Sequence, residues 1–210
     1  MNKHFYINKF AVWESSDDVE LPDVCFVPSM LRRRLTAVEK IGIYLANQVC
    51  ENRNDYFVVF ASRFGEWGQT IKLIKQFYED RELSPSGFSS SVHNAMPGLL
   101  SVLTHNTNSY TTVASKENTI DNGLLEAMIS NSPVLFIYAE EATPEFYKSK
   151  FDKSFRSHGV AILFSNEKIG CEIEVVSKYN ENKSVSFGEL VKFLNDGENL
   201  SCNHFDIRKI

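Results

Sequence analysis

Two residues in the middle of the chain could carry acyl-transfer chemistry. Ser115 ends a run of strand-forming residues, 109–115, and a serine hydroxyl becomes a nucleophile when a nearby histidine removes its proton. We consider His93 as that base, and His105 is the next histidine along the chain. Ser115 lies in no Gly-x-Ser-x-Gly motif, and a single histidine beside a helix start is more often a hydrogen-bonded structural residue. A small stand-alone acyltransferase or hydrolase that uses Ser115 is therefore the alternative hypothesis.

Other reactive residue types indicate no further site. Arg32, Arg33 and Arg34 could bind an anion, but consecutive helix residues point about 100° apart, so at most two would converge. The glycine-punctuated stretch 62–68 contains neither of the common nucleotide-binding motifs. The cysteines form no Cys-x-x-Cys pair, which favours reduced structural thiols; they are Cys25, Cys50, Cys171 and Cys202. We therefore expect no metal site and no cofactor.

The composition is typical of one globular domain. The chain has 210 residues, 43% of them hydrophobic, which is enough for one buried core. A net charge of -5 argues against a nucleic-acid partner, because such binding depends on phosphate neutralisation. No segment approaches the roughly 20 apolar residues of a membrane helix, and the first residues lack the apolar region of a signal peptide. We expect a cytoplasmic protein with a core over residues 8–178 and a C-terminal helix and tail over residues 184–210.

The stretch 88–102 must position His93, and we expect it to form the buried middle of the fold. It opens with polar residues and continues into apolar and small residues at helical spacing. Asn94 is a good N-cap residue, and Pro97 is tolerated only in a first turn, so the regular helix is expected to begin near Asn94. Gly98 indicates that another backbone comes close on one side. These features predict a central helix.

Strands and helices alternate along most of the chain. An apolar stripe from the capping residue Ser29 to Val49 predicts one long helix, whereas continuous apolar runs predict strands buried on both faces. The predicted strands span residues 5–13, 56–61, 109–115, 133–138, 159–164 and 171–176, and further helices span 117–130 and 187–194. Residues 196–210 are predicted to be a tail. The alternation predicts an α/β fold with a mostly parallel sheet of about five strands covered by helices.

Several motifs resemble those of a known family. Ser91-Val92-His93-Asn94-Ala95, with Gly98 and Ser101-Val102, is similar to the N-terminal half of β-ketoacyl synthases, specifically the short subgroup found with aryl-polyene and related type II polyketide systems. Further stretches occur in the order of that subgroup: Pro28-Ser29-Met30-Leu31-Arg32-Arg33-Arg34-Leu35, Ser62-Arg63-Phe64-Gly65-Glu66, Leu83-Ser84-Pro85 with Phe88-Ser89, and Gly123-Leu124-Leu125-Glu126-Ala127. The resemblance covers roughly residues 8–165. It implies a thiolase-like fold, of which this chain supplies one half.

The resemblance also implies where a catalytic residue is missing. In active β-ketoacyl synthases the nucleophilic cysteine lies at the turn from a strand into the next helix, where the helix terminus favours the thiolate. The corresponding turn here is Ala114-Ser115-Lys116-Glu117-Asn118, which contains no cysteine. The family's two catalytic histidines belong to a C-terminal half that lies beyond this sequence. We therefore expect no catalytic residue, with Ser115 and Lys116 at the position of the missing nucleophile.

By this resemblance we expect a non-catalytic subunit similar to a chain-length factor. It would pair with a full-length β-ketoacyl-carrier-protein synthase in aryl-polyene, related type II polyketide or fatty-acid chain elongation, and an acyl carrier protein is a further expected partner. A purely structural interaction protein is a third hypothesis. The candidate acyl-tunnel or central-helix residues are Phe88, Ser91, His93 and Asn94. The expected partner interface consists of Tyr110, Thr111, Thr112, Val113 and Ala114.

Overall fold

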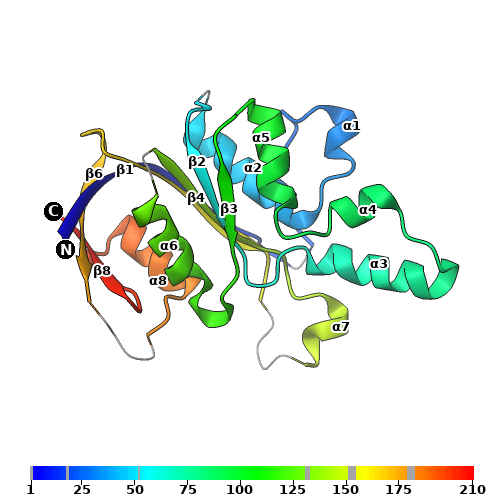
Figure 1. Cartoon of the computed structure of the whole chain (residues 1–210). Coiled ribbons are helices and arrows are strands. Elements are labelled where there is room, and N and C mark those ends of the chain that lie inside the picture. Colours follow the sequence, from blue (N-terminus) through cyan, green and yellow to red (C-terminus); the bar gives the residue numbers. More distant parts are fainter. Residues whose placement is uncertain (1, 18, 52, 131–132, 151–154, 179–182) are drawn as a thin grey trace.

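One long, twisted sheet runs through the protein (Figure 1). The structure, a computed structural model, describes residues 2–17, 19–51, 53–130, 133–150, 155–178 and 183–210. The strand order is β3-β2-β4-β5-β1-β6-β8-β7. The strands are β1 (Asn2–Glu14), β2 (Phe57–Ala61), β3 (Tyr110–Val113), β4 (Val134–Glu140), β5 (His158–Ser165), β6 (Cys171–Ser177), β7 (Asn199–Ser201) and β8 (Phe205–Lys209).

The strand number and directions correct the expectation of a mostly parallel sheet of about five strands. The described sheet has 8 strands, and only the β2–β3 and β2–β4 pairs are parallel. The neighbours β4–β5, β5–β1, β1–β6, β6–β8 and β8–β7 are antiparallel. A strand buried on both faces has the same continuous apolar pattern in either direction, so its pattern does not distinguish the two.

Helices cover both faces of this sheet and enclose two cores. On one face, Val38, Ile41 and Leu45 of α2 pack with residues of β2, β4 and β5. On the other face, Leu124 of α6 and Phe193 of α8 belong to the second core. The helices are α1 (Ser29–Arg32), α2 (Ala37–Cys50), α3 (Trp67–Asp80), α4 (Pro85–Ser89), α5 (Ala95–Thr104), α6 (Thr119–Ile129), α7 (Glu145–Lys148) and α8 (Phe187–Asn195), with a 3-10 turn η1 (Lys116–Asn118). No helix in the described ranges has the length and apolar character needed to cross a membrane.

The helix predicted to begin at Ser29 is divided in two. α1 ends at Arg32, and α2 begins only after Thr36. The Thr36 hydroxyl accepts a hydrogen bond from the Glu39 N–H at 3.1 Å, and the Glu39 carboxylate accepts one from the Thr36 N–H at 2.8 Å. This reciprocal capping box fixes the start of α2. The Thr-x-x-Glu spacing was a sequence signal for this second helix start, but the continuous apolar stripe predicted a single helix.

The stretch 88–102 lies largely at the surface of the protein. The expectation that it forms the buried middle of the fold was therefore wrong. α5 does begin directly after Asn94, as predicted. Met96 and Leu100 are buried against α2 and β2, but Val102 is 69% exposed. The centre of this face is covered by α2, which contacts β1, β4 and β5. α5 therefore buries one side in this chain and presents the other to solvent.

The C-terminal residues 183–210 form a cap on α6; the helix predicted over 187–194 is present in it as α8, whereas residues 196–210, predicted to be a tail, contain two strands. Asp121 of α6 is 1% exposed. Its carboxylate accepts hydrogen bonds from the Val185 N–H at 2.8 Å and from the Asn203 N–H at 2.9 Å. A second capping box, between Ser186 and Glu189, starts α8. The short strands β7 and β8 then extend the sheet beside β6, next to α8 (Figure 1).

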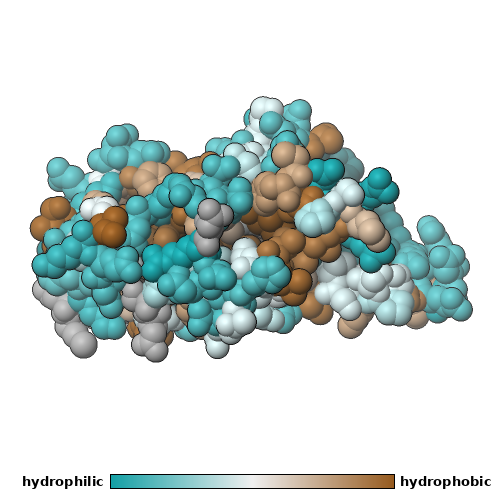
Figure 2. Space-filling view, turned by 90° about the horizontal axis from the view of Figure 1, so that it is seen from above, coloured by the Kyte–Doolittle hydropathy of each residue, from teal (hydrophilic) through white to brown (hydrophobic). Residues whose placement is uncertain are grey.

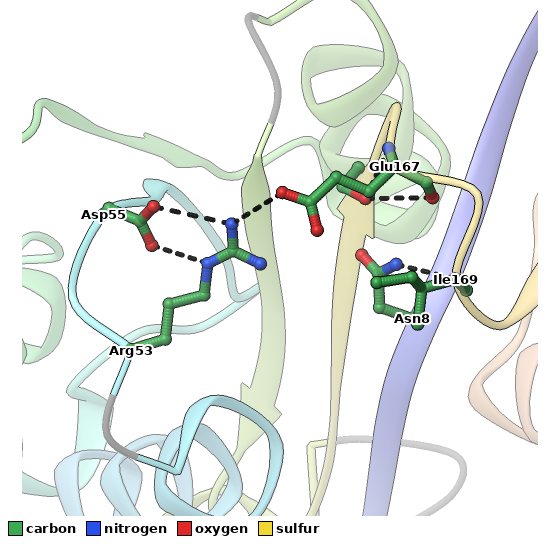
Figure 3. A network of polar contacts seen from close by, with 6 residues as sticks. Asn8, Arg53, Asp55, Glu167 and Ile169 are labelled. Atoms are coloured by element: carbon green, nitrogen blue, oxygen red, sulfur yellow. Dashed lines mark hydrogen bonds and ion pairs between the residues drawn. The ribbon is translucent and has the colours of Figure 1, made fainter.

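A polar network joins the turn between β5 and β6 to the loop after α2. Arg53 Nε lies 2.5 Å from Asp55 Oδ1, and a terminal nitrogen of the same guanidinium lies 3.2 Å from Glu167 Oε1. The Asn8 amide of β1 donates a hydrogen bond to the Ile169 carbonyl oxygen at 2.6 Å (Figure 3). The Arg53 guanidinium is thereby held between two carboxylates at the surface.

Candidate functional site

The turn after β3 leads directly from a strand into a helix and contains no cysteine. β3 ends at Val113, η1 begins at Lys116 and α6 begins at Thr119. Lys116 has a left-handed backbone with φ of 50°, which is uncommon for residues other than glycine. The four cysteines lie outside the turn, at positions 25, 50, 171 and 202. Among the described residues, no three His, Cys, Asp or Glu side chains are grouped to hold a metal ion.

Hydrogen bonds within this turn hold Ser115. Its hydroxyl accepts a hydrogen bond from Asn122 Nδ2 at 2.7 Å, and its backbone N–H donates to Thr119 Oγ1 at 2.9 Å. The Thr119 hydroxyl in turn donates to the Lys116 carbonyl oxygen at 2.7 Å. An amide that donates to a hydroxyl cannot remove its proton, so these contacts fix the turn without activating a nucleophile.

His93 lies against the loop that follows β2. Its Nε2 donates to the Ser62 carbonyl oxygen at 2.8 Å, and its ring centroid lies 5.5 Å from that of Phe60. A Cβ at Gly65 would come within 2.9 Å of His93 Cδ2, so this glycine makes room for the imidazole. Because Ser115 hydrogen-bonds to Asn122 instead, the structure does not join the proposed base and nucleophile of the acyltransferase hypothesis in one hydrogen bond.

The arginines at the end of α1 and directly after it do not form a common site either. Arg32 donates to the Cys25 carbonyl oxygen at 3.1 Å. Arg34 lines a groove on the side of α1 that faces α3 and α5. His105 is the C-cap residue of α5, with φ of 55°. These positions agree with structural and surface functions for Arg32, Arg34 and His105.

Two consecutive carboxylates that the sequence analysis did not single out hold the loop after β2. Glu140, the last residue of β4, is 1% exposed. It accepts hydrogen bonds from the Ser62 hydroxyl at 3.1 Å and from the Arg63 and Phe64 N–H groups. Glu141 accepts one from a backbone N–H in the first turn of α3 at 2.6 Å. The sequence signal is a pair of acidic residues directly after a continuous apolar strand.

Burial raises the pKa of the carboxyl groups around this loop. The pKa of Glu140 is raised to about 7, although its three hydrogen-bond donors favour the ionised form. Burial raises the pKa of Glu66, the N-cap residue of α3, to about 8, and the charges of Glu39 and Glu141 add to that shift. Burial also raises the pKa of both of these neighbours. Protonation here is therefore coupled to the packing of residues 62–68.

A small crevice of about 230 Å³ lies beside the turn after β3. Arg63, Lys116 and Phe187 are among its lining residues. The Arg63 guanidinium lies 2.7 Å from Glu117 Oε1 and also covers the Phe64 ring at 4.8 Å. The crevice thus offers cationic and aromatic groups that could contact a passing ligand, but no nucleophile paired with a base.

β3 is the first strand of the order, and its outer edge is not paired with another described strand. The carbonyl groups of Ser109 and Val113 accept hydrogen bonds from Val58 of β2 at 3.2 Å and from Ser62, directly after β2, at 3.1 Å. Alternate residues of a strand turn their backbone groups to opposite sides of the strand, so the N–H and C=O groups of Tyr110 and Thr112 point away from β2. Such an edge can accept a further strand.

Apolar side chains are exposed on β3 and on the helices α4 and α5. Val102 of α5 and Phe88 of α4 are 69% and 57% exposed, and Tyr110 of β3 is 38% exposed. Figure 2 shows apolar side chains gathered over the part of the molecule that carries α1 and α5. A groove of about 840 Å³ between α1, α3, α4 and α5 includes Leu73 and Leu99 in its walls. Because α5 contacts β3, the exposed side of α5 lies next to the open edge.

The candidate tunnel residues occupy different environments. Phe88 is exposed on α4, and the Ser91 hydroxyl donates to the Phe88 carbonyl oxygen at 2.8 Å. Asn94 is an exposed N-cap residue whose side chain makes no capping hydrogen bond. The groove itself is lined by their neighbours Ser89 and Ser90. A tunnel function for these residues stays a prediction.

The comparison with protein families decides the identity of this arrangement. A model of the beta-ketoacyl synthase N-terminal domain matches residues 9–200. The chain belongs to the β-ketoacyl synthase family. The match extends past the region in which the motifs were recognised and includes α8. Comparison with curated protein sequences gives no match.

Solved structures show the fold of this family member. It is similar to a chain of the ketosynthase (ApeO) in complex with its chain length factor (ApeC) from Xenorhabdus doucetiae, with 21% identity, a TM-score of 0.74, and coverage of 93% of this chain and 86% of that chain. A second similar structure is AntDE:AntF, a type II polyketide synthase acyl-carrier protein in complex with its ketosynthase bound to the hexaketide. The identity is 13% and the TM-score 0.64, and the match covers 87% of this chain and 72% of that chain. The ishigamide ketosynthase/chain length factor is 9% identical with a TM-score of 0.53, and the match covers 71% of this chain and 51% of that chain. The expected thiolase-like α/β fold is confirmed.

Proposed function

We propose that this chain is a chain-length-factor-like subunit without condensing activity of its own. It pairs with a full-length β-ketoacyl-carrier-protein synthase in aryl-polyene or related type II polyketide or fatty-acid elongation, stabilises that partner and helps shape the tunnel for the growing acyl chain. The observation that carries the proposal is the turn after β3, where Ser115 and Lys116 stand in place of a nucleophilic cysteine and Ser115 is hydrogen-bonded to Asn122. The expected cytoplasmic location stays a prediction.

Two features support a ketosynthase as the partner. The outward backbone groups of Tyr110 and Thr112 would be satisfied by a strand from a second subunit, and the exposed apolar groups of α4 and α5 would be covered beside it. The alignment with a chain of the ApeO–ApeC complex covers 93% of this chain and 86% of that chain, so the two chains have similar lengths. The AntDE:AntF structure supports an acyl carrier protein as a further partner of the assembly.

The test is reconstitution with a cysteine-containing ketosynthase from the same genome. The two proteins are co-expressed, size-exclusion chromatography measures their association, and elongation is assayed with acyl- and malonyl-carrier protein. We expect a stable pair, product from the pair, no product from this chain alone, and no product when the partner's cysteine is replaced. Condensation by this chain alone, or an acyl group on Ser115 in the mass spectrum, would show that the non-catalytic assignment is wrong.

A further inference from the structure

The open edge of β3 belongs to an uncharged stretch of the chain. Residues 83–115 contain no Asp, Glu, Lys or Arg, although these residue types make up 23% of the whole sequence. The stretch forms α4, α5 and β3, the elements that surround the open edge. Like charges that meet across an interface oppose association. A second copy of this chain can therefore approach the same surface without such repulsion.

The same stretch exposes apolar side chains. A Cβ at Gly98 would lie 3.4 Å from the Tyr110 hydroxyl oxygen, so the Tyr110 side chain extends over α5 and joins the strand edge to the helix surface. Covering apolar surface that is exposed to water is favourable, and a patch next to an open strand edge is typical of an interaction site. The exposed apolar residues of the stretch are Leu83, Phe88, Val92, Val102 and Tyr110.

The backbone of β3 is complementary to itself. The N–H and C=O groups of Tyr110 and Thr112 both point away from β2. If two β3 strands pair antiparallel about a two-fold axis at Thr111, Tyr110 of each copy faces Thr112 of the other, and each such pair exchanges two hydrogen bonds. This register satisfies the outward backbone groups of both residues. The two Thr111 residues then form the central pair, in which small uncharged side chains meet.

The opposite edge of the sheet lacks this character. β7 is the last strand of the order, and Asp196 and Glu198 directly precede it. Charged residues beside an edge strand oppose its pairing with another edge. Self-association through β3 is therefore favoured over self-association through β7.

We propose that, in the absence of its partner, this chain forms a symmetric homodimer in which the β3 edges of two copies pair antiparallel and the uncharged surface of residues 83–115 is shared between them. The interface uses the same patch on both copies, as a two-fold dimer requires. It also occupies the edge that the proposed function assigns to the ketosynthase, and this consequence rests on that function. The homodimer and the ketosynthase pair then exclude each other, so the homodimer covers the edge until a ketosynthase replaces one copy.

The test measures the full chain alone by sedimentation velocity over a series of concentrations. Thr112→Pro removes one outward N–H from each copy, and Thr112→Val, which keeps this donor, is the control. Cysteine cross-linking is independent of these variants and uses a Cys25→Ser background, because Cys25 is exposed. Thr111→Cys places a thiol at the proposed axis, and Asn199→Cys places one at the exposed start of β7 as the matched control.

We expect a reversible homodimer with a dissociation constant in the micromolar range. Thr112→Pro should raise this constant at least tenfold, since two hydrogen bonds are lost across the axis, whereas Thr112→Val should stay within about twofold of wild type. Under oxidising conditions Thr111→Cys should give a covalent dimer and Asn199→Cys should not. If Thr112→Pro does not fold, the cysteine variants decide. A chain that is monomeric throughout the series, a dimer that Thr112→Pro leaves unchanged, or cross-linking through Asn199→Cys instead would overturn the proposal.

Addition of the ketosynthase distinguishes this proposal from the proposed function. We expect the homodimer to disappear as the ketosynthase pair forms. A chain that is monomeric alone but pairs with the ketosynthase would overturn the homodimer and leave the proposed function in place. A homodimer that persists unchanged, without any ketosynthase pair, would do the reverse. A complex that contains the ketosynthase together with the Thr111→Cys cross-linked dimer would overturn the mutual exclusion.

Discussion

Ser115 receives a hydrogen bond from Asn122, and His93 donates one to the Ser62 carbonyl group. Neither contact prepares a nucleophile, so we expect Ser115→Ala to leave product formation by the reconstituted pair within about twofold of the wild-type rate. The measurement is the initial rate of elongation at equal concentrations of the pair. A loss of more than about tenfold, equivalent to roughly 1.4 kcal/mol in the barrier, would favour the acyltransferase hypothesis instead.

Glu66 makes the stability of the fold depend on pH. Because burial raises its pKa to about 8, the folded state holds this proton more tightly than the unfolded state, whose carboxyl has the ordinary value of 4.5. The free energy of unfolding should therefore fall as the pH rises from about 5 to about 8, and level off above that. Glu140, with a pKa of about 7, contributes in the same direction.

Glu66→Gln should reduce this pH dependence. Its free energy of unfolding should exceed that of wild type by on the order of 2 kcal/mol at pH 8.5 and differ little at pH 5. Urea unfolding at the two pH values measures it. Glu79→Gln is the control, because Glu79 is exposed on the same helix and should change neither value. Equal pH dependence in Glu66→Gln and wild type would contradict the assignment.

The sequence predicted these residue-level features unevenly. The absence of a cysteine from the turn 114–118 is visible from the sequence alone, since it depends only on which residues follow the strand. The hydrogen-bond partners of Ser115 and His93 could not be predicted, because Asn122 and Ser62 come close to them only once the turns have folded. Glu140 carries only a weak signal, since an acidic residue at a strand end is normally exposed, and here the loop after β2 folds over it.

The edge of β3 gives a prediction at the level of an element. Thr112→Pro removes an N–H that points away from β2, so the ladder between β2 and β3 should persist while a partner strand loses its donor. We expect the variant to keep its circular dichroism spectrum but to lose association with the ketosynthase in size-exclusion chromatography. Thr112→Val retains the donor and is the control. Unchanged association of Thr112→Pro would place the interface elsewhere.

Two glycines distinguish close packing from open surface. A Cβ at Gly159 of β5 would come within 2.8 Å of Ile41, Leu45 and the Tyr138 carbonyl oxygen, so Gly159→Ala should cost roughly 1 to 3 kcal/mol of unfolding free energy. At Gly98, the position that the sequence marked as crowded, the nearest atom is Tyr110 Oη at 3.4 Å. Gly98→Ala should instead stabilise α5 by about 0.5 to 1 kcal/mol. Thermal unfolding of both variants measures the difference, and equal losses would contradict it.

Element types were predicted well where the apolar pattern is local. The start of α5 follows from Asn94 and Pro97, whose backbone preferences act within one turn. The burial of α5 could not be predicted, because a stripe such as Met96 and Leu100 shows that one side is covered and says nothing of the other. Strand direction was wrong for the same reason: it depends on which segments become neighbours.

Asp121 connects the C-terminal cap to the rest of the molecule. Asp121→Ala would leave the N–H groups of buried Val185 and half-buried Asn203 without their acceptor, so it should lower the free energy of unfolding by roughly 1 to 3 kcal/mol. Hydrogen exchange should show the largest loss of protection in α8, β7 and β8. Glu126→Ala, at a half-buried position on the same helix, should cost less than about 1 kcal/mol. Uniform loss of protection across the sheet would mean that the cap does not open independently.

At the level of the whole molecule, the family and the thiolase-like fold were predicted from motif order, whereas the extent of the sheet was not. β7 and β8 have 3 and 5 residues, too few for a periodic pattern to stand out. Their place is set by β6 and by Asp121, which lie far from them in sequence. The sequence therefore predicted the part of the fold that the family's motifs mark, and missed the part held by long-range contacts.

The position of β1 has a consequence for biosynthesis. This strand is synthesised before its two neighbours β5 and β6, whose residues follow it by more than 140 positions in the chain. At about 5 to 20 residues per second, the strand waits on the order of ten seconds for its neighbours. During that time both of its edges are open to other nascent chains. Production at lower temperature, or with added chaperone, should therefore raise the soluble yield, and an unchanged yield would contradict this expectation.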